Sequence, residues 1–193
     1  MKLLFPIIER SHWREYLVLC LMGGAIAGAY GILHDQITYT LSAEYYTEVK
    51  FKQFAYADLG AGPRVFAGTV GFLATWWVGM IVGWFLARLA VPRFEGGDVR
   101  RLVARGFAVV FGGACAGGMG GYLFGRWQTA DGVPAFWRRL VRELDLEQPR
   151  EFIVVANVHN FGYLGALLGL VIAGGLIVRR SRRRAAGPKP AAA

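Results

Sequence analysis

The sequence predicts an all-α membrane protein, a four-transmembrane-helix bundle with interfacial helices in its two outside loops. Four apolar runs carry this prediction, because none of them contains Asp, Glu, Lys or Arg: 16–33, 65–87, 106–125 and 160–178. Each run has about 20 residues, enough for a helix to cross about 30 Å of hydrocarbon. The chain is 55% hydrophobic yet 18% charged, and its charges lie between the runs, as in multi-pass membrane proteins.

The basic residues predict the orientation of the helices. The segments before the first run, between the second and third, and after the fourth hold 14 Lys and Arg residues, whereas the other two loops hold 8. Because cytoplasmic loops are rich in basic residues, we expect both termini in the cytoplasm and the protein in a bacterial inner membrane. The net charge of +9 then reflects topology and contact with anionic lipid. It does not indicate nucleic acid, since no nucleic-acid-binding motif accompanies it.

Glycine stripes predict how the helices pack. Eight of the 20 residues in 106–125 are glycine, and glycines four residues apart form a smooth face that another helix can approach closely. We expect Trp76 and Trp77, in the middle of the second run, to fill the groove beside these glycines; a pore or ligand lining is the alternative. The predicted glycine packing positions are Gly79, Gly83, Gly113, Gly117, Gly121, Gly165 and Gly169.

The two outside loops predict interfacial helices. In the first loop, alternation of apolar and hydroxyl residues over 37–42 predicts a short extended segment, after which Ser42 caps a helix over 43–56. In the third loop, apolar residues at helical spacing over 136–144 predict an amphipathic helix, and Pro149 is expected to open the last helix. We interpret 1–184 as one membrane domain and 185–193 as a disordered cytoplasmic tail.

A short segment after the first run carries a family resemblance. The residues His34-Asp35-Gln36-Ile37-Thr38, followed by Glu44-Tyr45-Tyr46-Thr47, resemble a segment of uncharacterised bacterial inner-membrane proteins that read HDQ-[IV]-T and then E-Y-F-T. The match covers about 15 of 193 residues. It implies a membrane protein and no particular chemistry.

Two histidines are the candidate site residues. His34 ends the first run and His159 begins the fourth, so antiparallel helices would bring them to a similar depth on the outside. With Asp35 and Glu44 they could hold zinc or another transition metal, and two histidines on facing helices could bracket a haem. The prediction we favour is a structural cluster of polar groups with no cofactor; a proton- or substrate-binding site is a further alternative.

The predicted function is that of an integral-membrane scaffold or accessory subunit. Glycine faces and interfacial helices favour packing against a protein partner or a second copy within the bilayer. A small transporter or channel is the first alternative, although the runs contain few polar groups, and a metal- or haem-binding redox protein using His34 and His159 is the second. Because the sequence has no nucleophile motif and no phosphate-binding loop, we do not expect an enzyme.

Overall fold

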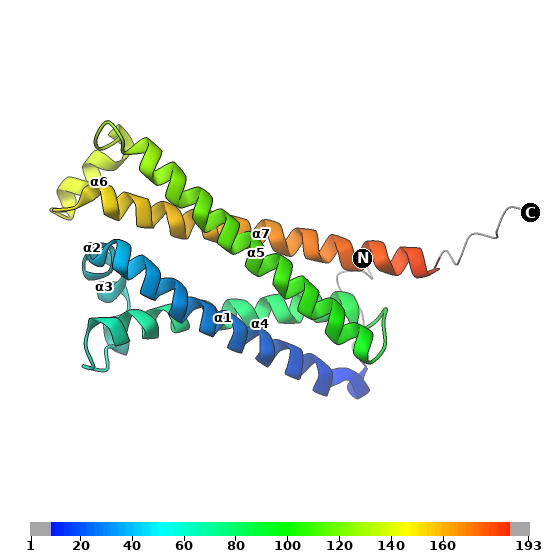
Figure 1. The fold of residues 1–193 in the computed structure, drawn as a ribbon. Helices are drawn as coiled ribbons and strands as arrows, with labels where there is room; N and C mark the ends of the chain where they lie inside the picture. Colours follow the sequence, from blue (N-terminus) through cyan, green and yellow to red (C-terminus); the bar gives the residue numbers. More distant parts are fainter. Residues whose placement is uncertain (1–8, 186–193) are drawn as a thin grey trace, which may run out of the picture.

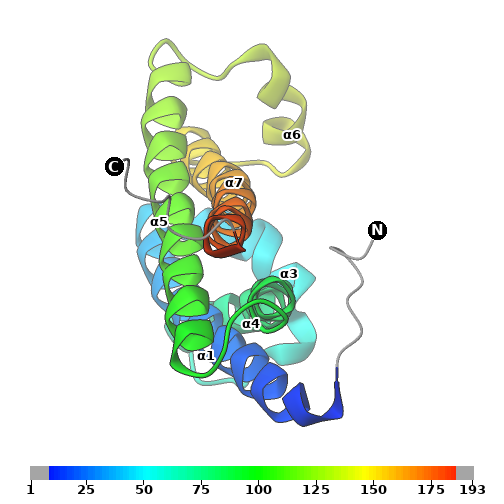
Figure 2. The ribbon, with the colours of Figure 1, turned by 90° about the vertical axis from the view of Figure 1, so that its right-hand side faces the viewer.

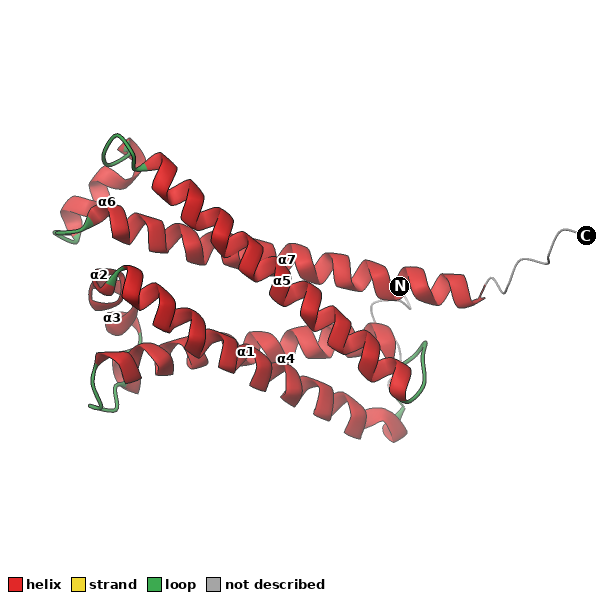
Figure 3. Cartoon of the chain, viewed as in Figure 1, coloured by secondary structure: helices red, strands yellow, loops and turns green. Residues whose placement is uncertain are grey.

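Four long helices make up the protein in the computed structural model, which describes residues 9–185 (Figure 1). They are α1 (Trp13–Leu41), α4 (Pro63–Ala90), α5 (Gly97–Gln128) and α7 (Pro149–Ala185), and a 3-10 turn, Arg10–His12, precedes α1. All four are long and apolar enough to cross a membrane, and residues 9–185 contain no strand (Figure 3). The predicted fold class is therefore confirmed, and each predicted apolar run lies inside one longer helix.

Glycines set the contacts within two antiparallel hairpins, α1–α4 and α5–α7. In the first hairpin, a Cβ added at Gly31 would lie 2.1 Å from the carbonyl oxygen of Gly71. In the second, a Cβ added at Gly113 would lie 2.4 Å from the carbonyl oxygen of Gly165. No side chain fits at such distances, so the two backbones of each hairpin are in direct contact, as small-residue faces allow in membrane helices.

The structure corrects the expected role of two tryptophans. The glycines of α5 face the backbone of α7, at Phe161 for Gly117 and at Asn157 for Gly121. Trp76 and Trp77 do not fill that groove, and their side chains are 39% and 49% exposed. A second helix backbone covers a glycine face more completely than two indole rings could, because it follows the face along its whole length.

The two hairpins pack together over an apolar core near one end of the bundle. This core includes Leu19 and Leu86 of the first hairpin and Val103, Phe107 and Ile177 of the second. We call this the arginine end, since the α4–α5 connection and the arginines that close α7 lie there. The opposite end, where α1 finishes and α7 begins, is called the histidine end. Figure 2 shows the long helices gathered side by side.

The first outside loop differs from its prediction. The residues expected to be extended continue α1 to Leu41, and within it Thr38 and Thr40 donate hydrogen bonds to the carbonyls of His34 and Gln36, four residues earlier. Ser42 then accepts from the Tyr45 amide, as the predicted cap does. The expected helix over 43–56 is divided into short pieces: α2 (Ala43–Tyr45), a π-helical turn (Tyr46–Lys50), α3 (Phe51–Gln53) and a 3-10 turn (Ala55–Ala57).

The third loop carries a 3-10 turn, Ala135–Trp137, followed by the short helix α6 (Arg138–Glu143). Phe136 is 87% exposed, so this segment presents an aromatic side chain outward from the bundle. Helix α7 begins at Pro149, as expected, and continues to Ala185. Of the tail predicted to be disordered, Ala185 ends α7, and 186–193 lie outside the described residues.

Candidate functional site

Three polar side chains meet between the hairpins at the histidine end. His34 and Asp35 come from α1 and His159 from α7, and one potential ligand atom from each lies within 4.8 Å of the other two. The two imidazole rings are in edge-to-face contact, with their centroids 4.9 Å apart. The predicted meeting of two histidines on antiparallel helices is thus found in the structure.

His159 has one ring nitrogen bound and one free. Its Nδ1 lies 3.0 Å from the carbonyl oxygen of Val155, one turn earlier in α7. Because a carbonyl only accepts, Nδ1 carries the proton, and Nε2 of the neutral ring has an unshared electron pair. Nε2 is buried, forms no hydrogen bond within residues 9–185, and lies 3.6 Å from Oδ1 of Asp35.

The other two members are fixed by α1. His34 and Asp35 are consecutive, and the Tyr30 hydroxyl, one turn before, lies 3.3 Å from Nδ1 of His34. Asp35 is only 4% exposed and therefore directs its carboxylate into the space between the hairpins. A buried carboxylate is costly unless hydrogen bonds or a cation compensate it.

Two tyrosines of the first outside loop cover the cluster. The ring of Tyr45 stacks on His159 at a centroid distance of 5.0 Å. Tyr46 is completely buried, and its hydroxyl lies 2.6 Å from Oγ1 of Thr38. Either hydroxyl can be the donor of this pair. The first loop is therefore tied directly to the helix turn that carries His34.

Burial shapes the electrostatics of this cover. It raises the pKa of the Tyr45 and Tyr46 hydroxyls, and the negative charge of Asp35 raises both further, so both rings stay neutral. Lys50 is also buried, and burial lowers the pKa of its ammonium group, although the attraction of Asp35 opposes that shift. The carboxylate of Asp35 thus acts on the pKa values of three residues in the first outside loop.

Glu44, the fourth predicted ligand, has a different role. Its two carboxylate oxygens accept hydrogen bonds from the amides of Glu147 and Gln148, at 2.6 and 2.9 Å. These amides lie just before α7, where helical N–H groups lack partners within the helix. Glu44 therefore fastens the first outside loop to the start of α7, and it is not a member of the cluster of His34, Asp35 and His159.

The close contact of the histidines also bears on the haem alternative. A haem held by both would require the flat macrocycle to lie between the two rings, with iron bound to a nitrogen on each side. The rings of His34 and His159 instead touch edge to face, which leaves no layer for a macrocycle between them. The site has the dimensions of a single small ion.

Sequence reasoning missed the cover of the site. Tyr45, Tyr46 and Lys50 were interpreted only as parts of a surface helix, yet all three face the cluster. The available signal was the segment that follows Ser42: two adjacent tyrosines beside a predicted polar site. The π-helical turn over Tyr46–Lys50 sets the direction of these side chains, and the periodicity of the sequence does not reveal such a turn.

Comparisons with known proteins identify no relative. No family model, no curated protein and no solved structure matches the chain.

Proposed function

We propose that this integral membrane protein binds one transition-metal ion of the zinc class between its two hairpins, through His34, Asp35 and His159. One observation carries the proposal: Nε2 of His159 and Oδ1 of Asp35, both hydrogen-bond acceptors when the ring is neutral, face each other in a buried place. Two buried acceptors repel unless a proton or a cation lies between them.

The distance between the two atoms favours a metal cation. At 3.6 Å the pair is longer than an N–H···O hydrogen bond, which spans about 2.7–3.2 Å. Ligand atoms bound tetrahedrally about 2.0–2.2 Å from one ion lie about 3.3–3.6 Å apart. The spacing of this pair agrees with the second arrangement, and the ligand atoms of all three residues lie within 4.8 Å of one another.

The surroundings of His159 resemble those of a metal ligand. Histidines that bind metals donate their second ring N–H to a carbonyl or carboxylate, which fixes the tautomer and orients the ring. The Nδ1 bond to Val155 does this for His159. Two imidazoles and one carboxylate suit zinc and its neighbours, and three protein ligands leave a fourth position for water or a small ligand.

Metal analysis of matched variants tests the proposal. The purified protein, stripped with a chelator and refilled with Zn²⁺, is expected to retain about one ion per chain after desalting, by elemental mass spectrometry. His159→Ala and Asp35→Asn should each reduce retention severely. His12→Ala is the control, since His12 is the third histidine of the chain and lies at the far end of α1, next to Ser11.

Two results would contradict metal binding. One is a wild-type protein that retains no metal and shows no change in thermal unfolding with Zn²⁺. The other is a retained ion that His12→Ala removes and His159→Ala leaves in place. Either result would assign the cluster a structural role in joining α1 to α7.

The wider role expected from the sequence, a scaffold or accessory subunit in a bacterial inner membrane, stays a prediction, as do cytoplasmic termini and the absence of enzyme activity. A second small-residue stripe on α5 supports the scaffold role. Cβ atoms added at Gly112 and Gly120 would meet nothing within 4 Å, so this face is open to a partner helix. Cys115, exposed on the same helix, allows a direct test. If oxidative cross-linking in membranes gives no product that Cys115→Ala abolishes, the packing role of this face is wrong.

A further inference from the structure

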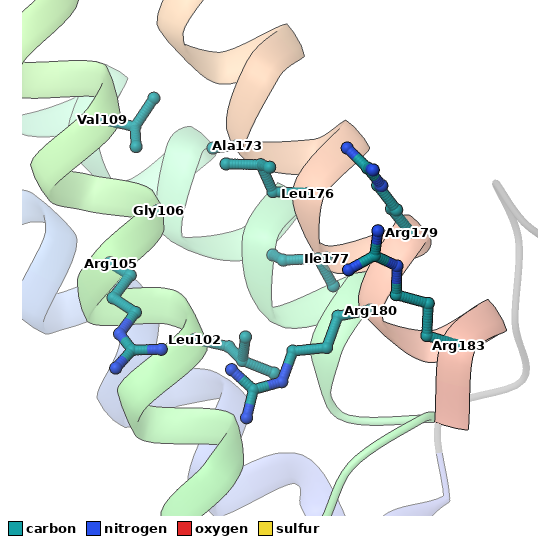
Figure 4. A pocket seen from close by; sticks show the side chains of 10 residues that line it. All are labelled: Leu102, Arg105, Gly106, Val109, Ala173, Leu176, Ile177, Arg179, Arg180 and Arg183. Carbon is teal, nitrogen blue, oxygen red and sulfur yellow. The ribbon is translucent and has the colours of Figure 1, made fainter. Parts of the chain in front are cut away.

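A groove with an apolar floor and a basic rim opens at the arginine end. It has a volume of about 510 Å³ and lies between α5 and α7. Its floor is formed by Leu102, Gly106 and Val109 of α5 and by Ala173, Leu176 and Ile177 of α7. Figure 4 shows these aliphatic side chains between arginines on either side of the groove.

Four arginines form the rim: Arg105 on α5 and Arg179, Arg180 and Arg183 on α7. All four are exposed. Within the described part of the chain, Arg105, Arg179 and Arg183 form no ion pair or side-chain hydrogen bond, while Arg180 lies near Asp98, which is paired with Arg184. Among residues 9–185, no acidic group is paired with the other three arginines of the rim.

The groove also lies where the apolar run of α7 ends and its arginines begin, the level at which we expect a phospholipid to change from apolar to charged. The apolar run of α7 ends at Val178, and the arginines begin at the next residue. From Ala173 to Arg183 the helix rises about 15 Å, enough to contact both the first part of an acyl chain and the phosphate above it. Arginine is well suited to the phosphate, because its planar group donates two parallel hydrogen bonds.

We propose that this groove is a binding site for one anionic phospholipid, with its phosphate among Arg105, Arg179 and Arg183 and its acyl chains over Leu102, Leu176 and Ile177. The charge of the rim excludes a site that depends on apolar contact alone, and the apolar floor distinguishes the groove from a site for a soluble anion. Basic pockets between membrane helices bind anionic headgroups by the same combination.

Native mass spectrometry of the detergent-solubilised protein tests this site. We expect the first molecule of phosphatidylglycerol to bind at least about tenfold more tightly than phosphatidylcholine, because each arginine near the phosphate adds attraction for an anion. Arg105→Gln with Arg183→Gln should abolish that preference, and this pair leaves the neighbours of Asp98 unchanged. Arg142→Gln with Arg150→Gln is the matched control, which removes the same charge at the histidine end.

Equal affinity for the two lipids, or a preference that survives the rim variant, would overturn the proposal. Displacement of phosphatidylglycerol by millimolar inorganic phosphate would overturn it as well and assign the groove to a soluble anion. If the double variant fails to fold, Arg183→Gln alone must still weaken the preference several-fold, since Arg183 is exposed near the end of α7 and contributes to no core.

Discussion

The two ends of the bundle hold the same pair of hairpins together by different means. At the arginine end, aliphatic and aromatic side chains from α1, α4, α5 and α7 form the contact between hairpins, and the charges lie outside. The histidine end also buries apolar side chains, such as Phe152 and Ile153 of α7. Its contact contains in addition two imidazoles, a carboxylate and the rings of Tyr45 and Tyr46. A polar interior is the more demanding of the two, because each buried group requires a specific partner.

The hairpins themselves do not cause this difference. Both are built on glycines in backbone contact, at Gly31 and Gly71 in one and at Gly113 and Gly165 in the other. What differs is the set of side chains that each hairpin presents to its neighbour at the two ends. Both ends bury apolar side chains, and only the histidine end adds a buried polar cluster to the contact between hairpins.

The largest expected effect comes from opening the apolar core. Leu86 is fully buried, and its side chain lies against Gly106 of the other hairpin. Leu86→Ala should lower the free energy of unfolding by about 2–4 kcal/mol, because it leaves a cavity where the hairpins meet. Denaturant unfolding in detergent measures this loss, and zinc retention per folded chain should not change.

The control for this prediction is Leu33→Ala, because Leu33 of α1 is 65% exposed. It should lower the unfolding free energy far less. If Leu86→Ala instead removes the metal while the protein stays folded, the two ends are coupled, and the expected independence of metal binding from the apolar core is wrong.

A smaller effect is expected from the cover of the cluster. Tyr46→Phe keeps the buried ring and removes the hydroxyl that is hydrogen-bonded to Thr38, so it should cost about 1 kcal/mol of stability. It should also weaken zinc retention modestly, because the loop is tied to the turn that carries His34. Tyr56→Phe, at a 79% exposed ring, is the control. Equal effects of the two variants would show that the buried hydroxyl contributes nothing specific.

Sequence reasoning reached the coarse features of this molecule because each depends on a local pattern. Apolar runs without charge gave the four spanning helices, and the positions of His34 and His159 at the ends of two antiparallel runs placed them at one depth. Pro149 marked the start of α7 and Ser42 the cap of α2, since both act through the backbone of adjacent residues.

The finer features depend on contacts between segments far apart in the chain. Glu44 was predicted to bind metal, yet it caps α7 from across the bundle, because the free amides of Glu147 and Gln148 lie within its reach. Trp76 and Trp77 were assigned to a groove that α7 occupies. Glu44 and the two tryptophans each had more than one plausible contact by residue type, and the three-dimensional arrangement determined which contact formed.

The smallest effect, on Lys50, tests the electrostatics of the histidine end. Burial lowers the pKa of its ammonium below the ordinary value of 10.5, so the unfolded chain binds more protons between the lowered pKa and 10.5. Stability must therefore rise with pH through that window as the cost of burying the charge disappears.

Lys50→Met removes this cost, so the metal-free variant should melt slightly higher than wild type at pH 7, and the difference should shrink as the pH approaches 10.5. Because a cation beside Asp35 also competes with a metal ion, the variant should bind Zn²⁺ more tightly. A variant that melts lower at pH 7 would mean that the attraction between Lys50 and Asp35 exceeds the cost of burial, and the pair would then satisfy the cluster without an ion.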